Sequence, residues 1–425
     1  MLSENKKGDD GHKMALHIDL DKCVRALAGM SARPTAPFYE ARVARYILDE
    51  LARLGLPVRK NEYGNIIGVY QGPSAPEGSL ALVAHMDHPA FELIEVNGRT
   101  ARGRLLGRVS RECFDRPVSV RVFPALPPQA GPDEGIAGRI VGYKAPEGGP
   151  LVFDLELDDR PPAQGFGIWD LPPLEVRDGL AYMRAVDDVV GCEAILLVLE
   201  ALVERQVPCR CFGVFTRAEE VGMLGATLLA EERLLPIDTV VVSIETSKTL
   251  PGAEIGQGPV IRVGDRTRTF DGNAEAVLQA ACQAMKQEAP EVKVQRQLMS
   301  GGSCEALMFI AEGYQTTAVA LPLGNYHNIG PELAIEPEYI HLDDLATLVE
   351  LLVRATEHLD ADPSAGPAEK YRAQAEASKE RLKASFAAWR LADANLERST
   401  VNLGLLQNTA PRYGRPFIRP TRGDR

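Results

Sequence analysis

The stretch that decides the fold is FTRAEEVGMLGA, residues Phe215–Ala226. A β-type segment, Pro208–Thr216, runs into two adjacent acids, Glu219 and Glu220, and a glycine-containing turn then leads into a helix. Successive side chains at the carboxyl end of a buried strand point in different directions, so one carboxylate can bind a metal while its neighbour faces the substrate. Metal-assisted hydrolysis needs such a ligand beside a general base. Taken alone, a Glu-Glu pair is more often solvated charge at a helix start, so its meaning depends on the rest of the chain.

The composition is typical of a large soluble globular protein. At 425 residues the chain exceeds one ordinary core, which predicts two domains and an appendage. No apolar run reaches the roughly 20 residues of a membrane span. The formal net charge of −12 argues against nucleic acid or an anionic membrane as a partner. The seven scattered cysteines indicate reduced thiols, and the polar N-terminus does not resemble a signal peptide, so we expect a cytoplasmic protein.

A second polar cluster follows the predicted strand Leu80–His85, whose continuous apolar run LALVA is typical of a sheet covered on both faces. The chain continues as AHMDHPAFEL, in which His85 and Asp87 flank one residue. An imidazole at the mouth of a strand can bind zinc, and a carboxylate two residues later can orient it. The alternative is an ordinary polar turn. We expect the adjacent His88 to be a partly exposed histidine near the site, with an extra ligand or a substrate contact as the alternatives.

The other candidates lie at predicted strand ends or at a helix start. They are Asp187 and Asp188 before the apolar helix Val190–Leu202, Glu245 at the end of the strand VVVSIE, and His327 after the strand Thr316–Leu321. Capping and the helix dipole already favour aspartate before a helix, so Asp187 by itself is a weak signal. In an open α/β sheet, however, the carboxyl ends of the strands converge on one crevice. We therefore expect five side chains to meet there: His85, Asp187, Glu220, Glu245 and His327.

Five such ligands suit two divalent metal ions that share one carboxylate. Paired ions roughly 3.5–4 Å apart can share a water, lower its pKa and polarise a carbonyl. Glu219, beside Glu220 but not bound to metal, would take the proton of this water and pass it to the leaving amine. We expect zinc, although cobalt and manganese also suit nitrogen and oxygen ligands.

The predicted domains follow from a change in pattern along the chain. An α/β pattern covers residues 14–90 and 180–360, which predicts one discontinuous catalytic domain. Residues 91–179 alternate short β-type segments with glycine and proline, which predicts an inserted small all-β barrel or sandwich. Residues 361–425 contain a charged helix, Ala368–Glu397, and an Arg/Pro-rich tail. This last stretch is either a surface helix with a disordered end or an oligomerisation arm.

The order of the motifs is similar to that of the co-catalytic dizinc aminopeptidases. An H-x-D motif, a β-rich insert, a DD pair before an apolar helix, the motif EEVGxxGA, a further acid and a late histidine follow one another within Ile18–Arg354. The position of the insert, between the first histidine and the DD pair, resembles in particular the tetrahedral or deblocking aminopeptidases (the glutamyl and leucyl type), metallopeptidase family 42. The related exopeptidases that have a dimerisation domain carry that domain later in the chain.

This resemblance implies a fold, an activity and residue roles. The fold would be a zinc-exopeptidase-like α/β/α sandwich of the phosphorylase/hydrolase type with a PDZ-like insert. The protein would form homo-oligomers, from dimers up to dodecamers, and would release N-terminal residues from peptides with a free N-terminus. The implied roles are His85 and Glu245 as ligands of one ion, Glu220 and His327 as ligands of the other, Asp187 as the bridge, Glu219 as the general base and Asp87 as the residue that orients His85.

Some positions depart from the family pattern, and two other functions stay open. Val189 stands where the family usually has arginine, and Glu245 where it usually has aspartate, which affects substrate preference and subunit contacts more than metal binding. An N-acyl amino acid deacylase or other amidohydrolase could use the same ions with a basic pocket residue such as Arg184. An inactive scaffold is the third possibility. The complete ligand set argues against it, because an inactive site has no need of five convergent charges.

Overall fold

The computed structural model describes residues 18–75, 78–128, 133–361 and 367–392. The chain divides into two units, Met1–Pro363 and Ser364–Arg425. The polar N-terminal stretch and the Arg/Pro-rich tail noted above lie outside the described residues.

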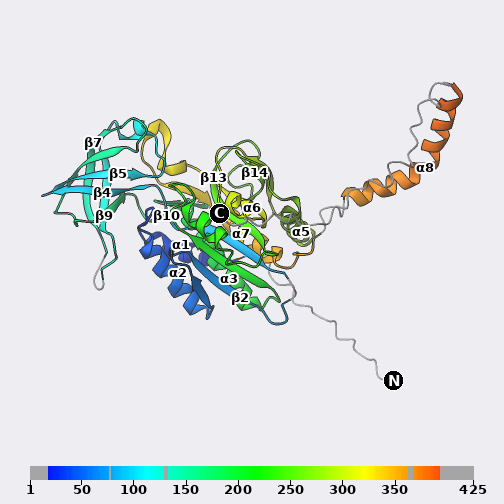
Figure 1. The fold of residues 1–425 in the computed structure, drawn as a ribbon, viewed down its shortest axis with the longest axis horizontal. Coiled ribbons are helices and arrows are strands. Elements are labelled where there is room, and N and C mark those ends of the chain that lie inside the picture. Colours follow the sequence, from blue (N-terminus) through cyan, green and yellow to red (C-terminus); the bar gives the residue numbers. More distant parts are fainter. Residues whose placement is uncertain (1–17, 76–77, 129–132, 362–366, 393–425) are drawn as a thin grey trace, which may run out of the picture. The chain divides into compact units, whose positions relative to one another are not determined.

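The first unit is built on an eight-stranded mixed sheet with the order β1-β2-β12-β3-β13-β16-β14-β15 (Figure 1). Its strands are β1 (Val58–Lys60), β2 (Ile66–Gln71), β3 (Leu80–His85), β12 (Arg210–Thr216), β13 (Val240–Lys248), β14 (Val260–Asp265), β15 (Gln295–Met299) and β16 (Gln315–Leu323). The four central strands, β12, β3, β13 and β16, run parallel to one another. Their carboxyl ends therefore share one edge of the sheet, where ligands of open α/β sheets bind.

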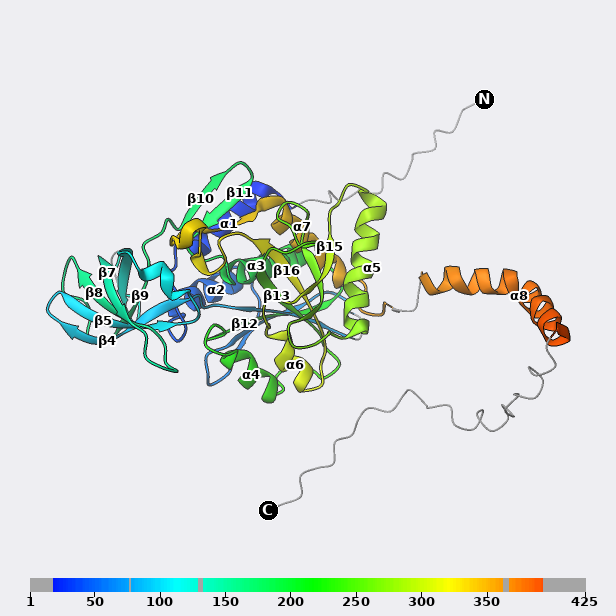
Figure 2. The same cartoon turned by 90° about the horizontal axis from the view of Figure 1, so that it is seen from above.

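Helices cover both faces of this sheet. One face carries α1 (Leu20–Ser31), α2 (Ala41–Arg53), α3 (Val189–Arg205), α5 (Gly272–Glu288) and α7 (Leu342–Ala355). The other carries α4 (Leu224–Glu231) and α6 (Ala306–Ala311), which lie on the opposite side of β12 and β13 from α1 and α7 (Figure 2). In β3, Leu80 and Leu82 pack toward the first group of helices, while Ala81 and Val83 pack toward the second. This double coverage explains the continuous apolar run of the strand.

Between β3 and α3 the chain forms a closed six-stranded barrel with the order β4-β5-β8-β7-β6-β9. Its strands are β4 (Ala90–Asn97), β5 (Thr100–Leu106), β6 (Val118–Pro124), β7 (Ile136–Lys144), β8 (Val152–Leu157) and β9 (Gly165–Trp169), with the 3₁₀ turn η1 (Arg111–Phe114) between β5 and β6. Aromatic rings, among them Phe91, Phe153 and Trp169, fill its core. The all-β character expected of this part of the chain is confirmed.

A small antiparallel sheet has the order β10-β11-β17. It consists of β10 (Leu174–Arg177), β11 (Leu180–Met183) and β17 (Glu338–His341). Met183 of β11 pairs with Glu338 of β17. This pairing brings a segment from near the end of the first unit against the residues that lead into α3.

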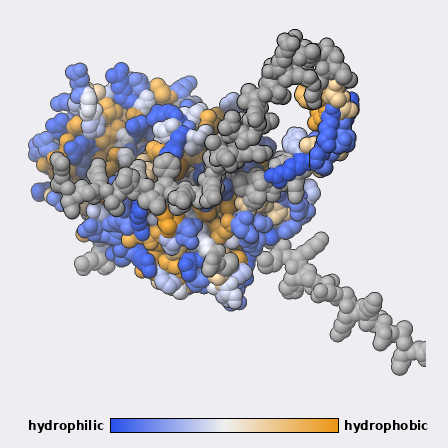
Figure 3. Space-filling view, turned by 45° about the vertical axis from the view of Figure 1, so that its right-hand side comes forward, coloured by the Kyte–Doolittle hydropathy of each residue, from blue (hydrophilic) through white to orange (hydrophobic). Residues whose placement is uncertain are grey.

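The second unit contributes one described helix, α8 (Pro367–Ala392). It lies within the predicted helix Ala368–Glu397 except for its first residue, and residues 393–397 lie outside the described ranges. Tyr371 and Leu382 of α8 are 67% and 64% exposed. No helix in the described ranges is long and apolar enough to cross a membrane. On the face shown in Figure 3, hydrophobic residues are scattered among hydrophilic ones.

Candidate metal centre

The structure brings the predicted site residues together at the carboxyl edge of the parallel strands. His85 is the last residue of β3, Glu219 and Glu220 follow β12, and His327 lies in a 3₁₀ turn, η2 (Tyr326–Asn328), after β16. Asp187 lies two residues before α3. The expectation that Glu245 ends its strand was wrong, because β13 pairs with β16 as far as Lys248. Glu245 therefore projects from within a strand.

Among the residues that the structure describes, three groups of histidine, aspartate and glutamate side chains have ligand atoms within 4.8 Å of one another. They are His85–Asp187–Glu245, Asp187–Glu220–His327 and His85–Glu219–Glu220. Asp187 belongs to the first two groups: its Oδ1 lies 3.5 Å from Nε2 of His85, and its Oδ2 lies 3.7 Å from Nε2 of His327. One carboxylate thus faces both imidazoles, which is the geometry that a bridging ligand requires.

Backbone carbonyls orient both imidazoles. Nδ1 of His85 lies 3.2 Å from the carbonyl oxygen of Asp87, and Nδ1 of His327 lies 2.5 Å from that of Arg108. An Nδ1 that faces a carbonyl must carry the proton, so the lone pair of each neutral ring is on Nε2, on the side of Asp187. Arg108 follows β5, so the barrel helps to orient a histidine of the α/β sheet.

The burial of these groups favours a bound cation. His85 is 1% exposed, Asp187 3%, and His327 6%. Within the described ranges, Oδ1 of Asp187 and Oε1 of Glu220 are buried and have no hydrogen-bond partner. Buried carboxylate oxygens without partners are costly unless a cation compensates them. The nitrogen and oxygen donors present here therefore fit a pair of divalent metal ions.

Several acids and one histidine of the site have pKa values displaced from their usual range. Burial, reinforced by neighbouring carboxylates, raises the pKa of both Glu219 and Glu245 to about 8. The same causes raise the pKa of Glu220 well above its usual range. Burial lowers the pKa of His327 to about 4. A divalent cation would reverse the shifts of the glutamates, because it favours carboxylates, and it would act in the same direction as burial on His327, because it favours the neutral imidazole.

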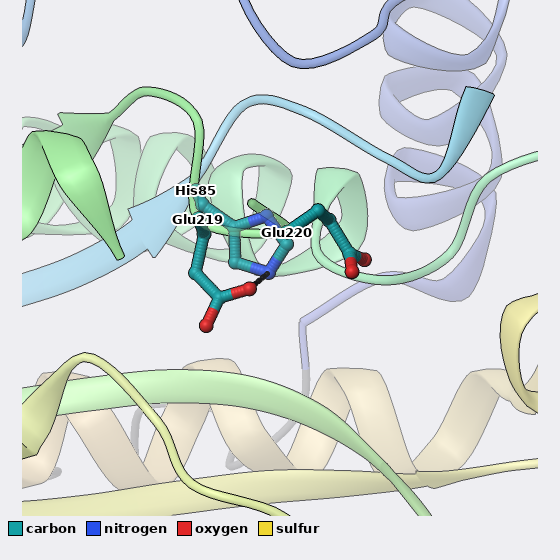
Figure 4. Close-up of side chains that lie close together, drawn as sticks. All are labelled: His85, Glu219 and Glu220. Carbon is teal, nitrogen blue, oxygen red and sulfur yellow. Dashed lines mark ion pairs between the residues drawn. The ribbon is translucent and has the colours of Figure 1, made fainter. Parts of the chain in front are cut away.

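The two adjacent glutamates point in different directions, as their place after a strand predicts (Figure 4). Oε2 of Glu219 lies 3.9 Å from Nε2 of His85, and the side chain of Glu219 is 13% exposed. Oε1 of Glu220 lies 3.5 Å from Nε2 of His327. Glu219 also belongs to the third group of ligand atoms, so the geometry permits it to bind an ion as well as to act as a base.

Asp87 contacts both halves of the site. Its Oδ1 lies 3.6 Å from Nδ1 of His85. Its carboxylate also accepts hydrogen bonds from the backbone N–H groups of Glu219, at 3.0 Å, and Glu220, at 3.1 Å. Asp87 therefore lies beside the histidine and also fixes the backbone of the glutamate pair. The H-x-D spacing alone did not predict the contact with the glutamates.

His88 is buried, with 3% of its surface exposed, so the expectation of a partly exposed side chain was wrong. Its Nδ1 lies 2.5 Å from the carbonyl oxygen of Asp187, and its Nε2 lies 2.9 Å from Oδ1 of Asn328. The ring therefore bridges two segments of the site. It belongs to none of the three ligand groups.

Sequence reasoning missed Glu338, which is fully buried beside the site. Its carboxylate accepts hydrogen bonds from the backbone N–H groups of Val186, Asp187 and His327. Burial raises the pKa of this carboxyl. Glu338 lies in an acid-rich stretch, PELAIEPE, and nothing in the local pattern sets it apart from its neighbours. Only the pairing of β17 with β11 brings it here.

The site opens into a cleft of about 1100 Å³. Glu219, Glu220 and His327 line it beside residues of the barrel such as Arg104 and Arg108. Arg184, which the deacylase alternative placed in the substrate pocket, lines a small separate pocket with His88 and Val189. The cationic side chains of the large cleft are instead Arg104, Arg108 and Arg266.

The chain is similar to known proteins in sequence pattern and in fold. Residues 164–351 match the model of a family described as M42 glutamyl aminopeptidase. The dodecameric PhTET1-12s is similar in structure, with a TM-score of 0.62 and 21% identity over 78% of this chain and 98% of that chain. The TET1 peptidase of Pyrococcus horikoshii, which can assemble into a tetrahedron or a large octahedral shell, has a TM-score of 0.62 and 20% identity over 80% of this chain and 99% of that chain.

A TET aminopeptidase from Thaumarchaeota archaeon SCGC AB-539-E09 gives a TM-score of 0.66 and 16% identity over 80% of this chain and 98% of that chain. At these identities the structures establish a shared fold. Together with the family match, they confirm the resemblance that the motifs predicted.

Proposed function

We propose that this chain is a dinuclear-metal aminopeptidase that removes N-terminal residues from peptides. Its match to the M42 family model and its fold indicate a peptidase, which is a hydrolase. The observation that carries the proposal is the placement of Asp187 between the two imidazoles, with one carboxylate oxygen toward each. His85 and Glu245 complete one ion site, and Glu220 and His327 complete the other. Zinc is the metal that this mixture of imidazole and carboxylate ligands suits, with cobalt and manganese as alternatives.

The residues of the chain divide the chemistry between them. Bound divalent ions supply Lewis acidity, which lowers the pKa of a water molecule and polarises the scissile carbonyl. Glu219 accepts the proton of the attacking water and donates it to the leaving amine. Its backbone is fixed by Asp87, and its carboxylate lies at the cleft, where both transfers take place. Glu220, its neighbour, points toward His327 and serves as a ligand.

The charge of the cleft suits a short peptide. Its lining includes Glu219 and Glu220, which attract a free α-ammonium group. Its walls carry Arg108 and Arg266, for which no ion pair is found within the described part of the chain, whereas Arg104 is paired with Glu92. The same arginines would suit the carboxylate of an N-acyl amino acid, so a deacylase is the second candidate.

We also propose that the barrel is of the PDZ-like type and that the protein is a homo-oligomer. Support for the barrel is its six-stranded closed order. Support for the assembly comes from the structural neighbours, which are described as a dodecamer and as a tetrahedron or octahedral shell.

Metal analysis of the purified protein, combined with a panel of aminoacyl and N-acetyl-aminoacyl chromogenic amides, tests the function. We expect two divalent ions per chain and cleavage of the free-amine substrates only. Two ions with cleavage of the acylated substrates only would make the protein a deacylase. A protein that binds no metal after reconstitution would not be an enzyme of this kind.

A further inference from the structure

Glu338 is a buried carboxylate that connects two distant segments of the site. It is fully buried at the start of β17, and it lies opposite Met183 in the antiparallel pair with β11. The residues that follow Met183 lead to the proposed bridging ligand Asp187. The residues before β17 contain the other segment, with His327.

The hydrogen bonds of Glu338 divide between these two segments, and His88 Nε2 lies 3.9 Å from its Oε2. Its Oε2 accepts hydrogen bonds from the backbone N–H groups of Val186, at 2.7 Å, and Asp187, at 3.1 Å. Its Oε1 accepts a hydrogen bond of 2.7 Å from the backbone N–H of His327. One side chain therefore holds together two ligand-bearing segments that lie far apart in the sequence. Glu338 belongs to none of the groups whose atoms could share a metal ion, so it acts on the site through the backbone.

The segment around His327 needs such support. Asn325, His327 and Asn328 all have positive φ angles, of 57°, 56° and 61°. These angles lie in the left-handed region, which residues other than glycine adopt infrequently. Such a conformation persists only where surrounding contacts fix it. The hydrogen bond from the N–H of His327 to Glu338 is one of these contacts, and the ring of His88 provides a second between Asp187 and Asn328.

We propose that Glu338 is a positioning residue that sets the distance between Asp187 and His327 and thereby the affinity of the ion site formed by Asp187, Glu220 and His327. This inference rests on the proposed dinuclear function. Outer partners that orient metal ligands typically contribute about 10- to 100-fold to metal affinity. The ion site of His85 and Glu245 lacks the His327 segment and depends less on Glu338.

Stepwise binding of Co²⁺ to the metal-free protein, followed by calorimetry and by visible absorption, tests the proposal. In Glu338→Gln one oxygen is replaced by an NH₂ group, which cannot accept a hydrogen bond from a backbone N–H. We expect binding of one Co²⁺ equivalent to weaken about 10- to 100-fold, while the other equivalent changes little. The matched control is Glu336→Gln in the same segment, since no hydrogen bond or ion pair of that carboxyl is found within the described ranges. Wild-type affinity for both equivalents in Glu338→Gln would overturn the proposal.

A measurement on the wild-type protein covers the case in which Glu338→Gln does not fold. In the metal-free protein we expect the amides of Val186, Asp187 and His327 to exchange with solvent far more slowly than in an unstructured peptide. Exchange at the rate of an unstructured peptide would show that Glu338 does not hold these segments, and the inference would be wrong.

The two proposals fail in different ways. If wild-type protein binds two ions and cleaves peptides while Glu338→Gln retains both affinities, the role of Glu338 is wrong and the function stands. If wild-type protein binds no ion, both are wrong.

Discussion

The carboxylate of Asp87 accepts a hydrogen bond of 3.0 Å from the backbone N–H of Glu219. The residue two positions after the first histidine therefore fixes the residue that we propose as the general base. Because Asp87 also lies beside His85, a single buried carboxylate links one proposed metal ligand to the proposed general base.

Glu219→Gln should abolish turnover and leave both metal ions bound. The amide cannot accept the proton of the attacking water, and general-base catalysis typically contributes about 10²- to 10⁴-fold to the rate. Chromogenic peptide hydrolysis measures the loss, and metal analysis of the same sample shows that the site is intact. Glu231→Gln, at an exposed position on α4, is the matched control. A Glu219→Gln variant with two ions and full activity would mean that another group is the base, and a variant that loses an ion would make Glu219 a ligand.

Asp87→Asn should lower kcat about 10- to 100-fold, the usual effect of removing a partner that orients a metal site. Oδ1 of Asp87 accepts a hydrogen bond from the backbone N–H of Glu219, and Oδ2 accepts one from that of Glu220. Asparagine retains only one acceptor oxygen. Steady-state kinetics on the metal-loaded protein measures the effect, with Asp49→Asn on the exposed side of α2 as control. Unchanged kcat would show that the contact does not position the base.

Asp187→Ala should lose at least one ion per chain. Its two oxygens face the two imidazoles, so its removal takes a ligand from both proposed ion sites. Elemental analysis after exhaustive dialysis measures the stoichiometry, and Asp238→Ala in an exposed loop serves as control. Two ions in Asp187→Ala would exclude Asp187 as the bridge.

The stability of the metal-free protein should fall as pH rises, partly because of Glu193 in α3. Burial, followed by the charges of Glu50 and Glu200, raises the pKa of Glu193 to about 8. The folded protein therefore retains a proton on Glu193 that the unfolded chain releases near its ordinary pKa of about 4.5. The unfolded state binds fewer protons between about pH 4.5 and pH 8, so stability decreases across this window and is constant above it.

Glu193→Gln should weaken that dependence. We expect the variant to match wild-type protein near pH 5 and to exceed it near pH 8, by a free energy of unfolding on the order of a few kcal/mol at most. Urea unfolding at both pH values measures the difference, with the exposed Glu291→Gln as control. Equal pH slopes for the variant and the wild-type protein would show that Glu193 does not contribute to this dependence.

Arg108 and Arg266 should favour peptides with a free carboxyl terminus. Both line the cleft, neither has an ion pair with a described residue, and a guanidinium attracts a carboxylate. Arg266→Gln should raise KM for a free tripeptide several-fold more than KM for the same tripeptide with an amidated end. Equal effects on both peptides would exclude this contact.

The sequence by itself determined the catalytic sheet and the edge on which the site lies. The apolar run before His85, the β-type segment before Glu219 and the strand before His327 identified three parallel strands that end in polar residues. Burial along a strand is encoded in local periodicity, so such a pattern is readable without the fold. The same reasoning predicted an all-β insert, either a barrel or a sandwich, because its short segments lack helical periodicity.

Only the tertiary structure decided how these residues contact one another. It placed the carbonyl of Arg108 against His327, 219 residues away in the sequence, and the carboxyl of Glu338 against Val186, 152 residues away. It also buried His88 and placed Arg184 outside the large cleft. Periodicity records whether a residue faces the core, but it does not record which distant backbone groups share that core. Those contacts depend on strand pairing and on the packing of the barrel against the α/β part of the chain.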